Sequence, residues 1–214
     1  MDNNFFVVAG NIGCGKTTLT KLLSEEFAFK PYFESVNDNP YLSDFYQSME
    51  RWSFPLQIYF LNHRFKTHRL IESTQGSSIQ DRSIYEDANI FARALFEQKS
   101  MDARDYENYL NLYYSMIEFL SPPTLMIFLK RSLPKLKERI ALRGRDYEKN
   151  IPSEYLERLN NYYEDFAANY NFGKSIVVDT DDLDFINNQE DFQTLIKKIK
   201  NTLDQQDMFI TLNS

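Results

Sequence analysis

The stretch Gly10-Asn11-Ile12-Gly13-Cys14-Gly15-Lys16-Thr17 decides how this chain folds, because it fills every fixed position of the pattern G-x-x-x-x-G-K-[ST]. The apolar run Phe5–Ala9 before it predicts a buried strand, and the segment Thr17–Phe27 after it predicts a helix. Glycines in such a loop let backbone N–H groups face phosphate oxygens, and the helix N-terminus adds a partial positive charge. We therefore expect Gly10 to Thr18 to bind a nucleotide, with Lys16 at its β- and γ-phosphates and the Thr17 hydroxyl on Mg²⁺.

The composition excludes several classes of protein. A net charge of −7 argues against general binding to nucleic acid, which needs a cationic surface. A single cysteine, Cys14, excludes an internal disulfide and a zinc site built from several cysteines. No apolar run approaches membrane-spanning length, and the first residues resemble a strand rather than a signal peptide. We expect one domain over residues 1–214, located in the cytoplasm, with no nucleic-acid or membrane partner.

Short apolar runs alternate with long amphipathic stretches, which predicts an α/β fold with helices covering a parallel sheet. Five segments are predicted to be strands: Phe5–Ala9, Pro31–Phe33, Ser77–Gln80, Leu125–Leu129 and Ser175–Val178. Seven segments are predicted to be helices: Thr17–Phe27, Ser53–Glu72, Glu86–Glu97, Asp102–Leu120, Leu133–Leu142, Ser153–Tyr170 and Glu190–Asp204. Ser53 is expected to cap its helix, with Pro55 in the first turn, and residues 205–214 are expected to fray.

Acidic side chains follow two of the predicted strands. Ligands of open α/β sheets bind beyond the carboxyl ends of the strands, so Glu34 is expected near the phosphates, where it can accept a proton from an attacking hydroxyl. Asp81 can hold Mg²⁺ opposite Thr17, and the adjacent Arg82 can orient an acid or neutralise a transferring phosphoryl group. The alternatives are a solvated loop glutamate at position 34 and a surface ion pair at positions 81 and 82.

Three arginines lie within a stretch of seven residues, although the chain as a whole is acidic. Arg139 and Arg143 are four residues apart and share one face of the predicted helix. Gly144 is expected to end that helix, so that Arg145 belongs to the polar segment that follows. This pattern is typical of an arginine-bearing lid, about residues 144–150, that closes over a triphosphate. The alternative is a solvated helix end.

A further group of residues is suited to the recognition of a base. Gln57 and Arg64 project from the same face of the predicted helix Ser53–Glu72, and Asp87 and Phe91 form a second pair with helical spacing. An aromatic face for stacking, with an amide, a guanidinium and a carboxylate for the base edge, can form a base pocket. The Gln57 amide offers a donor and an acceptor that match adenine. The alternative is a buried polar network.

Together these motifs resemble the deoxyribonucleoside kinase family, in the branch that contains deoxycytidine, deoxyguanosine and deoxyadenosine kinases. The resemblance spans nearly the whole chain. Within the family, the chain is most similar to the bacterial purine-type members. Besides the phosphate loop it rests on Phe33-Glu34-Ser35, Asn39-Pro40-Tyr41-Leu42, Trp52-Ser53-Phe54-Pro55-Leu56-Gln57, Arg64, Asp81-Arg82-Ser83-Ile84-Tyr85 and Leu142-Arg143-Gly144-Arg145. It implies a P-loop kinase fold with a five-stranded parallel sheet, and ATP-dependent phosphorylation of a deoxynucleoside 5′-hydroxyl in nucleotide salvage.

The resemblance also implies roles at the reacting end of the site. Glu34 matches the carboxylate that accepts the 5′-hydroxyl proton, and Arg82 matches the arginine that holds this carboxylate and the 5′-oxygen. Asp81 matches the acid on the Mg²⁺ side. The residues that match the lid arginines are Arg139, Arg143 and Arg145. Asp181 and Asp182 are expected beside the adenine of ATP.

At the acceptor end, Tyr46 and Glu148 match the residues that bind the sugar 3′-hydroxyl. The residues that match the base-binding set are Trp52, Gln57, Arg64, Asp87 and Phe91. Thymidine-accepting members of the family lack the charged pair of Arg64 and Asp87. The pair therefore favours deoxyadenosine, deoxyguanosine or deoxycytidine as the substrate. Among these we expect deoxyadenosine to be preferred, because of the Gln57 amide and the resemblance to purine-type members, with deoxyguanosine or deoxycytidine as the alternatives.

The chain departs from the family pattern at two positions. Ser35 stands where many members have proline, and Cys14 stands at a loop position that is often alanine. Cys14 suggests the hypothesis that the enzyme is sensitive to thiol reagents. The family also implies a homodimer, formed through the aromatic faces of Ser53–Glu72 and Asp102–Leu120.

Two other functions use the same loop. A nucleoside monophosphate kinase would need cations for the phosphate of its acceptor, whereas Glu34 suits a neutral hydroxyl. A regulatory P-loop ATPase would give no use to Tyr46, Gln57 and Glu148 together.

Overall fold

A computed structural model describes residues 3–34, 39–145, 148, 151–181 and 183–204 of the chain. Several residues named in the sequence analysis lie outside this described part: Ser35, most of the predicted lid (146–147 and 149–150), Asp182 and the tail 205–214. Within the described part, a five-stranded sheet has the order β2-β3-β1-β4-β5. The strands are β1 (Phe5–Gly10), β2 (Lys30–Tyr32), β3 (Ser78–Asp81), β4 (Leu125–Lys130) and β5 (Lys174–Asp179).

All neighbouring strands pair in parallel, so their carboxyl ends meet at one edge of the sheet. The register places Val8 of β1 beside Asp81 of β3 and beside Ile127 of β4. Side chains alternate between the two faces: Val7 packs into one core cluster, and Val8 packs into the other. Because both faces are covered, β1 is apolar at nearly every position, as expected for a buried parallel strand.

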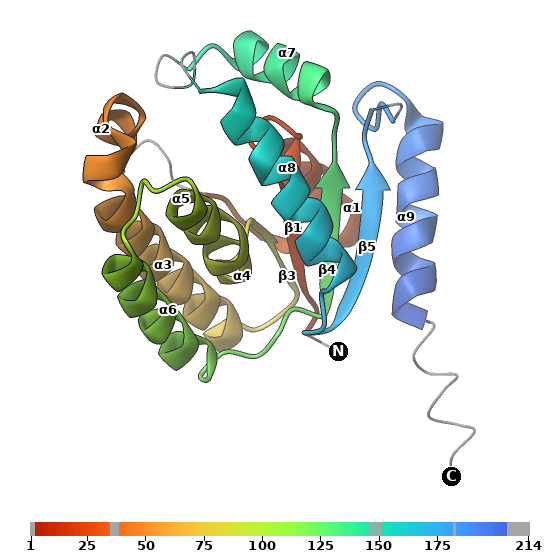
Figure 1. The fold of residues 1–214 in the computed structure, drawn as a ribbon. Coiled ribbons are helices and arrows are strands. Elements are labelled where there is room, and N and C mark those ends of the chain that lie inside the picture. Colours follow the sequence, from red (N-terminus) through yellow and green to blue (C-terminus); the bar gives the residue numbers. More distant parts are fainter. Residues whose placement is uncertain (1–2, 35–38, 146–147, 149–150, 182, 205–214) are drawn as a thin grey trace.

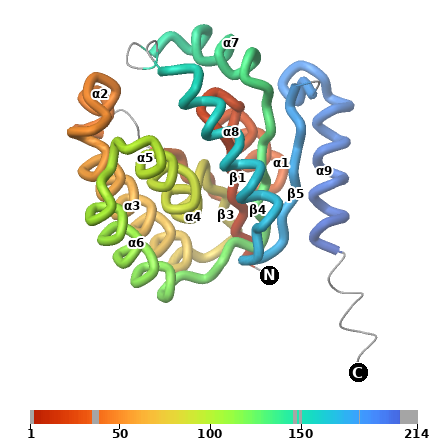
Figure 2. Tube along the Cα trace, viewed as in Figure 1, coloured from red at the N-terminus to blue at the C-terminus, as the bar shows by residue number. Residues whose placement is uncertain are grey.

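Helices cover both faces of the sheet (Figure 1). One face packs against α1 (Lys16–Phe27), α7 (Leu133–Arg143) and α9 (Gln189–Asp204). On the other face α8 (Ser153–Ala168) packs against β4, and the same core cluster extends to α3 (Met49–Ser73) and to α6 (Ala103–Ile117), which packs on α3. Figure 2 shows α3 and α6 side by side on the flank of the molecule farthest from β5. The predicted α/β fold with a five-stranded parallel sheet is confirmed.

The prediction for the start of α3 is wrong. The helix begins at Met49, with Ser48 at the N-cap position, so Pro55 lies inside it. The Ser53 hydroxyl donates to the carbonyl of Met49 at 2.6 Å instead of capping a helix. Proline removes only the bond to the carbonyl four residues earlier, that of Arg51, whose residue is exposed near the helix start. This carbonyl lies where water can reach it.

Two helical features have no counterpart in the sequence prediction. The short helix α2 (Leu42–Gln47) precedes α3 and was not predicted. The predicted helix Glu86–Glu97 starts earlier and is divided: α4 (Ile84–Glu86) continues into the π-helix η1 (Asp87–Ala92) and α5 (Arg93–Glu97). A π-helical turn is rare and is found frequently at functional sites. Here it carries Asp87 and Phe91, two of the residues expected to contact a base.

The remaining helix ends follow local signals. Asp102 caps α6 by accepting a hydrogen bond from the Asp105 N–H at 2.8 Å, and Ser132 precedes Pro134 at the start of α7. Gly144 ends α7 with a φ of 66°, as predicted. Over the described residues, every helix is too short or too polar to cross a membrane.

Candidate active site

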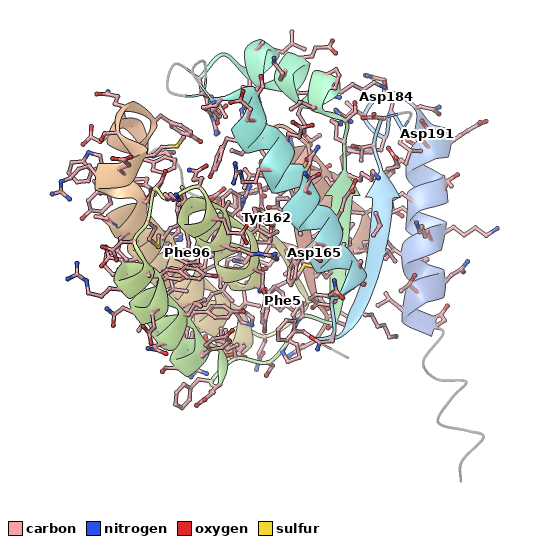
Figure 3. All side chains as sticks on the ribbon, viewed as in Figure 1. Phe5, Phe96, Tyr162, Asp165, Asp184 and Asp191 are labelled. Atoms are coloured by element: carbon pink, nitrogen blue, oxygen red, sulfur yellow. The ribbon has the colours of Figure 1, made fainter. Side chains whose placement is uncertain are left out.

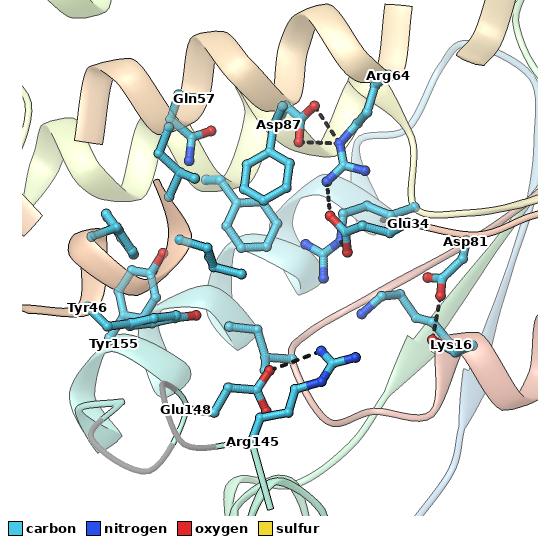
Figure 4. A pocket seen from close by; sticks show the side chains of 18 of the residues that line it. Lys16, Glu34, Tyr46, Gln57, Arg64, Asp81, Asp87, Arg145, Glu148 and Tyr155 are labelled. Carbon is cyan, nitrogen blue, oxygen red and sulfur yellow. Dashed lines mark hydrogen bonds and ion pairs between the residues drawn. The ribbon is translucent and has the colours of Figure 1, made fainter. Parts of the chain in front are cut away.

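A pocket opens at the carboxyl edge of the sheet, beyond the ends of β1 and β3 (Figure 4). The pocket is partly open to solvent, and its empty space is about 810 Å³ when the open mouth is counted. Most of the predicted site residues line it: Ile12, Lys16, Thr17, Glu34, Tyr46, Gln57, Arg64, Asp81, Arg82, Asp87, Phe91, Arg143, Arg145 and Glu148. The structure therefore brings together residues from segments that are far apart in the sequence.

The phosphate loop has the backbone that its glycines predict. Gly10, Gly13 and Gly15 all have positive φ angles, of 149°, 83° and 100°. A Cβ on Gly10 would lie 2.7 Å from the Cys14 sulfur and 2.8 Å from the Leu129 carbonyl oxygen. The loop is therefore closed to larger residues at its first position.

Lys16 is held against the loop itself. Its Nζ atom donates to the carbonyl oxygens of Gly10 and Asn11, both at 2.9 Å. Burial lowers the pKa of Lys16, and the nearby Arg82 lowers it further. An ammonium group has three donors, so one remains for a phosphate oxygen.

Thr17 and Asp81 face each other across the loop, as predicted for a metal site. The Thr17 hydroxyl donates to Asp81 Oδ2 at 2.5 Å, and Asp81 Oδ1 is buried with no hydrogen-bond partner among the described residues. Mg²⁺ prefers oxygen ligands and is usually held by one or two carboxylates together with substrate phosphates. These two side chains fit such a site. The described residues contain no cluster of three or more acidic, histidine or cysteine ligands.

Four charged side chains connect the phosphate end of the pocket with its base end. Arg64 donates from Nη2 to Glu34 Oε1 at 2.5 Å and from Nε to Asp87 Oδ1 at 2.7 Å. Arg82 approaches the other oxygen of the same carboxylate, with its Nε 3.6 Å from Glu34 Oε2. Glu34 is therefore held between two arginines, and the alternative of a solvated loop glutamate is wrong.

The surroundings of this network set its protonation. Burial alone would raise the pKa of Glu34, but Arg64, Arg82 and Lys16 lower it to about 2. Burial raises the pKa of Asp87, while the adjacent Arg64 opposes that rise. For Arg82, burial acts to lower the pKa, and the nearby Tyr163, Glu34, Glu86 and Asp81 together raise it well above its usual value. Glu34 therefore remains a carboxylate and Arg82 a cation at neutral pH.

The lid residues that the structure describes meet at Glu148. Arg143 donates to Glu148 Oε2 from Nε at 2.9 Å and from Nη2 at 2.5 Å, and Arg145 donates to Oε1 at 3.3 Å. Glu148 is only 5% exposed and lines the pocket. Arg139 takes a different place, because it is exposed and lines a separate hollow that contains Asp181.

The base end of the pocket lies beneath α3 and the π-helix η1. Gln57 is buried, and its Oε1 has no hydrogen-bond partner among the described residues. Figure 4 shows Gln57, Arg64 and Asp87 at one end of the pocket, with Lys16 and Asp81 at the other. A hydrogen-bonding group left unsatisfied at this depth is costly unless a ligand completes it.

The aromatic residues divide between the pocket and its surroundings. Phe91 lines the pocket, and the Arg82 guanidinium carbon lies 4.4 Å from its ring centroid. Tyr46 also lines it, from the unpredicted helix α2. Trp52 is absent from the described lining; its ring packs on Tyr41 at 5.8 Å between centroids.

Several residues that line the pocket were not among the predicted site residues. Tyr155 lines it from the first turn of α8, and Phe60 lines it beneath the Arg64 guanidinium at 5.1 Å. Phe60 stands between Gln57 and Arg64 in the sequence, so its position near them is a usable signal. Tyr155 has only its place just after the lid segment.

Cys14 does not support the thiol-reagent hypothesis. The side chain is fully buried, and burial raises the pKa of its thiol. A thiol reacts mainly as an exposed thiolate, so this cysteine is protected in the folded protein.

Comparisons with known proteins agree with this geometry. A family model described as deoxynucleoside kinase matches residues 6–204. The deoxyadenosine/deoxycytidine kinase of Bacillus subtilis (strain 168) is 36% identical over 203 residues, covering 94% of this chain and 94% of its own length. The deoxyadenosine kinase of Dictyostelium discoideum is 42% identical over 166 residues, covering 78% of this chain and 67% of its own.

Solved structures show the same relationship. The deoxyadenosine kinase of M. mycoides with dCMP and a flexible dCDP bound superposes with a TM-score of 0.82 at 29% identity, covering 92% of this chain and 99% of its own. The same enzyme with bound dATP superposes with a TM-score of 0.81 at 29% identity, covering 92% of this chain and 100% of its own.

Proposed function

The chain belongs to the deoxynucleoside kinase family and is a kinase of deoxynucleosides with a P-loop kinase fold; from this premise we propose that it prefers deoxyadenosine, with ATP as phosphate donor. The family decides against a nucleoside monophosphate kinase and against a regulatory ATPase. We further propose that residues 1–214 act as one kinase domain in the cytoplasm, with an arginine-bearing lid at about 144–150.

The observation that carries the proposed mechanism is the position of Glu34. Its carboxylate lies between Arg64 and Arg82 at the point where the base end and the phosphate end of the pocket meet. A nucleoside with its base near Gln57 would place its 5′-hydroxyl beside Glu34. In the proposed reaction this hydroxyl attacks the γ-phosphorus in line, its proton passes to Glu34, and ADP leaves.

A carboxylate whose pKa is about 2 is a weak base in the resting site. Phosphoryl transfer makes little demand on a strong base, because its transition state is loose and the nucleophile loses its proton late. Glu34 then mainly orients the hydroxyl and takes the proton as the new bond forms. Arg82 neutralises charge on the transferring group, and Lys16, Arg143 and Arg145 are proposed to stabilise the phosphates.

Thr17 and Asp81 are proposed to hold Mg²⁺, which is supported by the unpartnered Asp81 Oδ1 and the facing Thr17 hydroxyl. The ion would neutralise charge on the β- and γ-phosphates when it is bound. The donor base is proposed to lie in the second hollow, which both Arg139 and Asp181 line. The sugar 3′-hydroxyl is proposed to bind Tyr46 and Glu148.

Deoxyadenosine preference is supported by the chemistry of the base end. The Gln57 amide can donate to N7 or N1 and accept from N6 of adenine, and Asp87 can accept a second hydrogen bond. Phe91 offers a face for stacking, as proposed, and Trp52 can act only through its neighbours because it is absent from the described lining. The relatives named for deoxyadenosine point the same way.

The test is a set of initial rates with ATP and Mg²⁺ for deoxyadenosine, deoxyguanosine, deoxycytidine, thymidine and adenosine. We expect deoxyadenosine to have the highest kcat/KM and thymidine to fail. A lead for deoxyguanosine or deoxycytidine would overturn the base preference and leave the family assignment intact. Phosphorylation of a monophosphate but of no nucleoside would overturn the assignment of Glu34.

A homodimer is proposed through the outer faces of α3 and α6. Large hydrophobic side chains remain exposed on these helices or just beyond them, namely Leu70, Leu112, Tyr114 and Phe119. Exposed apolar groups at one flank are typical of an interface. Sedimentation velocity at micromolar concentration should give a dimer, and Phe119→Glu should shift it to monomer. A wild-type protein that sediments only as a monomer would contradict this.

A further inference from the structure

Arg82 is held in an uncommon backbone conformation. Its φ is 67°, in the left-handed region that residues other than glycine rarely adopt, and the residue is only 5% exposed. Such strain persists only where the surrounding contacts fix it, and it is found at functional sites. The contacts that fix Arg82 therefore matter for the proposed transfer.

One of these contacts comes from the helix that follows the lid. Arg82 Nη1 donates to the hydroxyl of Tyr163 at 3.2 Å, and this hydroxyl donates to Glu86 Oε1 at 2.8 Å. Chiefly through burial, the pKa of Tyr163 is raised well above its usual value, so the phenol keeps the proton that it donates. A hydroxyl that donates to a carboxylate becomes a better acceptor for the cation on its other side.

Glu86 is fully buried and is itself fixed at three points. Its Oε2 accepts from the Ser83 N–H at 2.8 Å and from the Ser83 hydroxyl at 3.3 Å. Its Oε1 also lies 3.4 Å from the N–H of Gly10, the first residue of the phosphate loop. The carbonyl of the same Gly10 accepts from Arg82 Nη2 at 3.4 Å. Glu86 therefore joins the Tyr163 hydroxyl to the backbone on which the phosphates would lie.

We propose that Tyr163 is a positioning residue for phosphoryl transfer, whose hydroxyl, supported by Glu86, holds the Arg82 guanidinium toward Glu34 and the reacting 5′-oxygen. This inference rests on the proposed role of Arg82. Tyr163 itself is absent from the described lining of the pocket, so it acts through Arg82 and not by contact with substrate.

The chain contains a matched control at the next position. The Tyr162 hydroxyl, labelled in Figure 3, also donates to a glutamate, Glu97 of α5, and also lies beside an arginine, Arg93, 4.7 Å from its ring centroid. Tyr162 and Tyr163 thus share a helix, a partner type and a neighbouring cation. Tyr162 does not line the pocket. Removing its hydroxyl therefore breaks the hydrogen bond to Glu97 and leaves the contacts of Arg82 unchanged.

The experiment compares kcat and both KM values of the wild type, Tyr163→Phe and Tyr162→Phe in the full chain. Tyr163→Phe should lower kcat about tenfold while the KM values for deoxyadenosine and ATP stay within about twofold. Tyr162→Phe should keep the wild-type kcat. Because the hydroxyl acts through Arg82, adding Tyr163→Phe to Arg82→Lys should change kcat less than about twofold.

A wild-type kcat in Tyr163→Phe overturns the inference, and so does a full tenfold loss on the Arg82→Lys background. If Tyr163→Phe does not fold because Glu86 loses a partner, Tyr163→Phe/Glu86→Gln removes that buried charge as well. The same tenfold loss is then expected, and a wild-type kcat overturns the inference. If Arg82→Lys itself is fully active, the proposed role of Arg82 fails together with the inference. If Arg82→Lys has a low kcat and Tyr163→Phe has the kcat of the wild type, the inference about Tyr163 is overturned and the proposed role of Arg82 stands.

Discussion

Arg64 Nη2 lies 2.5 Å from Glu34 Oε1, so a residue proposed to recognise the base also holds the proposed catalytic carboxylate. The same guanidinium binds Asp87 through Nε. In the proposed mechanism, recognition of the base and orientation of Glu34 are coupled through this single side chain. A correct base that meets Gln57 and Asp87 would also fix the position of the group that accepts the proton.

The first prediction concerns Asp87. Asp87→Asn keeps the size of the side chain and removes the charge that pairs with Arg64. We expect kcat/KM for deoxyadenosine to fall about tenfold to a hundredfold, because a buried charged hydrogen-bond network is broken. The KM for ATP should change less than about twofold.

The control is Asp165→Asn, which breaks another aspartate–arginine pair, 2.8 Å from Arg93 and exposed on α8. Exposed pairs contribute little, so the kinetics should stay at wild-type values. An equal loss for deoxyadenosine and ATP in Asp87→Asn would contradict a role at the base end.

The second prediction concerns acid stability. Because the pKa of Glu34 is lowered from 4.5 to about 2 in the folded state, its carboxylate stabilises the fold at pH values above the unfolded pKa. This contribution, about 3 kcal/mol at most, is lost as pH falls from about 4.5 through about 2. Urea unfolding of wild type and Glu34→Gln should therefore show a gap in free energy near pH 6 that narrows near pH 3. A gap that is constant with pH would contradict the pairing with Arg64 and Arg82.

The third prediction concerns two glycines with positive φ. At Gly10 a Cβ would meet Cys14 Sγ at 2.7 Å and the Leu129 carbonyl oxygen at 2.8 Å, whereas at Gly76 nothing lies within 4 Å. Gly76→Ala should cost only the backbone strain, about 1–2 kcal/mol. Gly10→Ala should cost more and should also raise the KM for ATP. Thermal melts and ATP kinetics check this, and equal losses in the two variants would contradict the close packing of the loop.

Much of the fold follows from local patterns. The strands β1 and β4 begin where the apolar runs begin, because a strand buried on both faces is apolar throughout. The phosphate loop is specified by its own residues, since the glycines and the helix start are local features. The ends of α7 follow from Ser132, Pro134 and Gly144 for the same reason.

The features that were not predicted depend on contacts between distant segments. The start of α3 at Met49 contradicts the local signal of Ser53 and Pro55, because packing against the rest of the fold outweighs a cap. The π-helical turn at Asp87–Ala92 has no simple sequence pattern. The site residues on single segments were predictable, whereas the ion pairs of Arg64 with Glu34 and Asp87 join residues that are 30 and 23 positions apart. The same is true of the Tyr163–Arg82 contact, which joins residues 81 positions apart.

The central claim is that Glu34 accepts the proton of the attacking 5′-hydroxyl. Single-turnover rates of deoxyadenosine phosphorylation by wild type and Glu34→Gln, with substrate affinity measured separately, test it most directly. We predict a loss in the rate of transfer of at least about a hundredfold, with deoxyadenosine affinity changed less than about fivefold. A Glu34→Gln enzyme that transfers phosphate at nearly the wild-type rate would contradict the account.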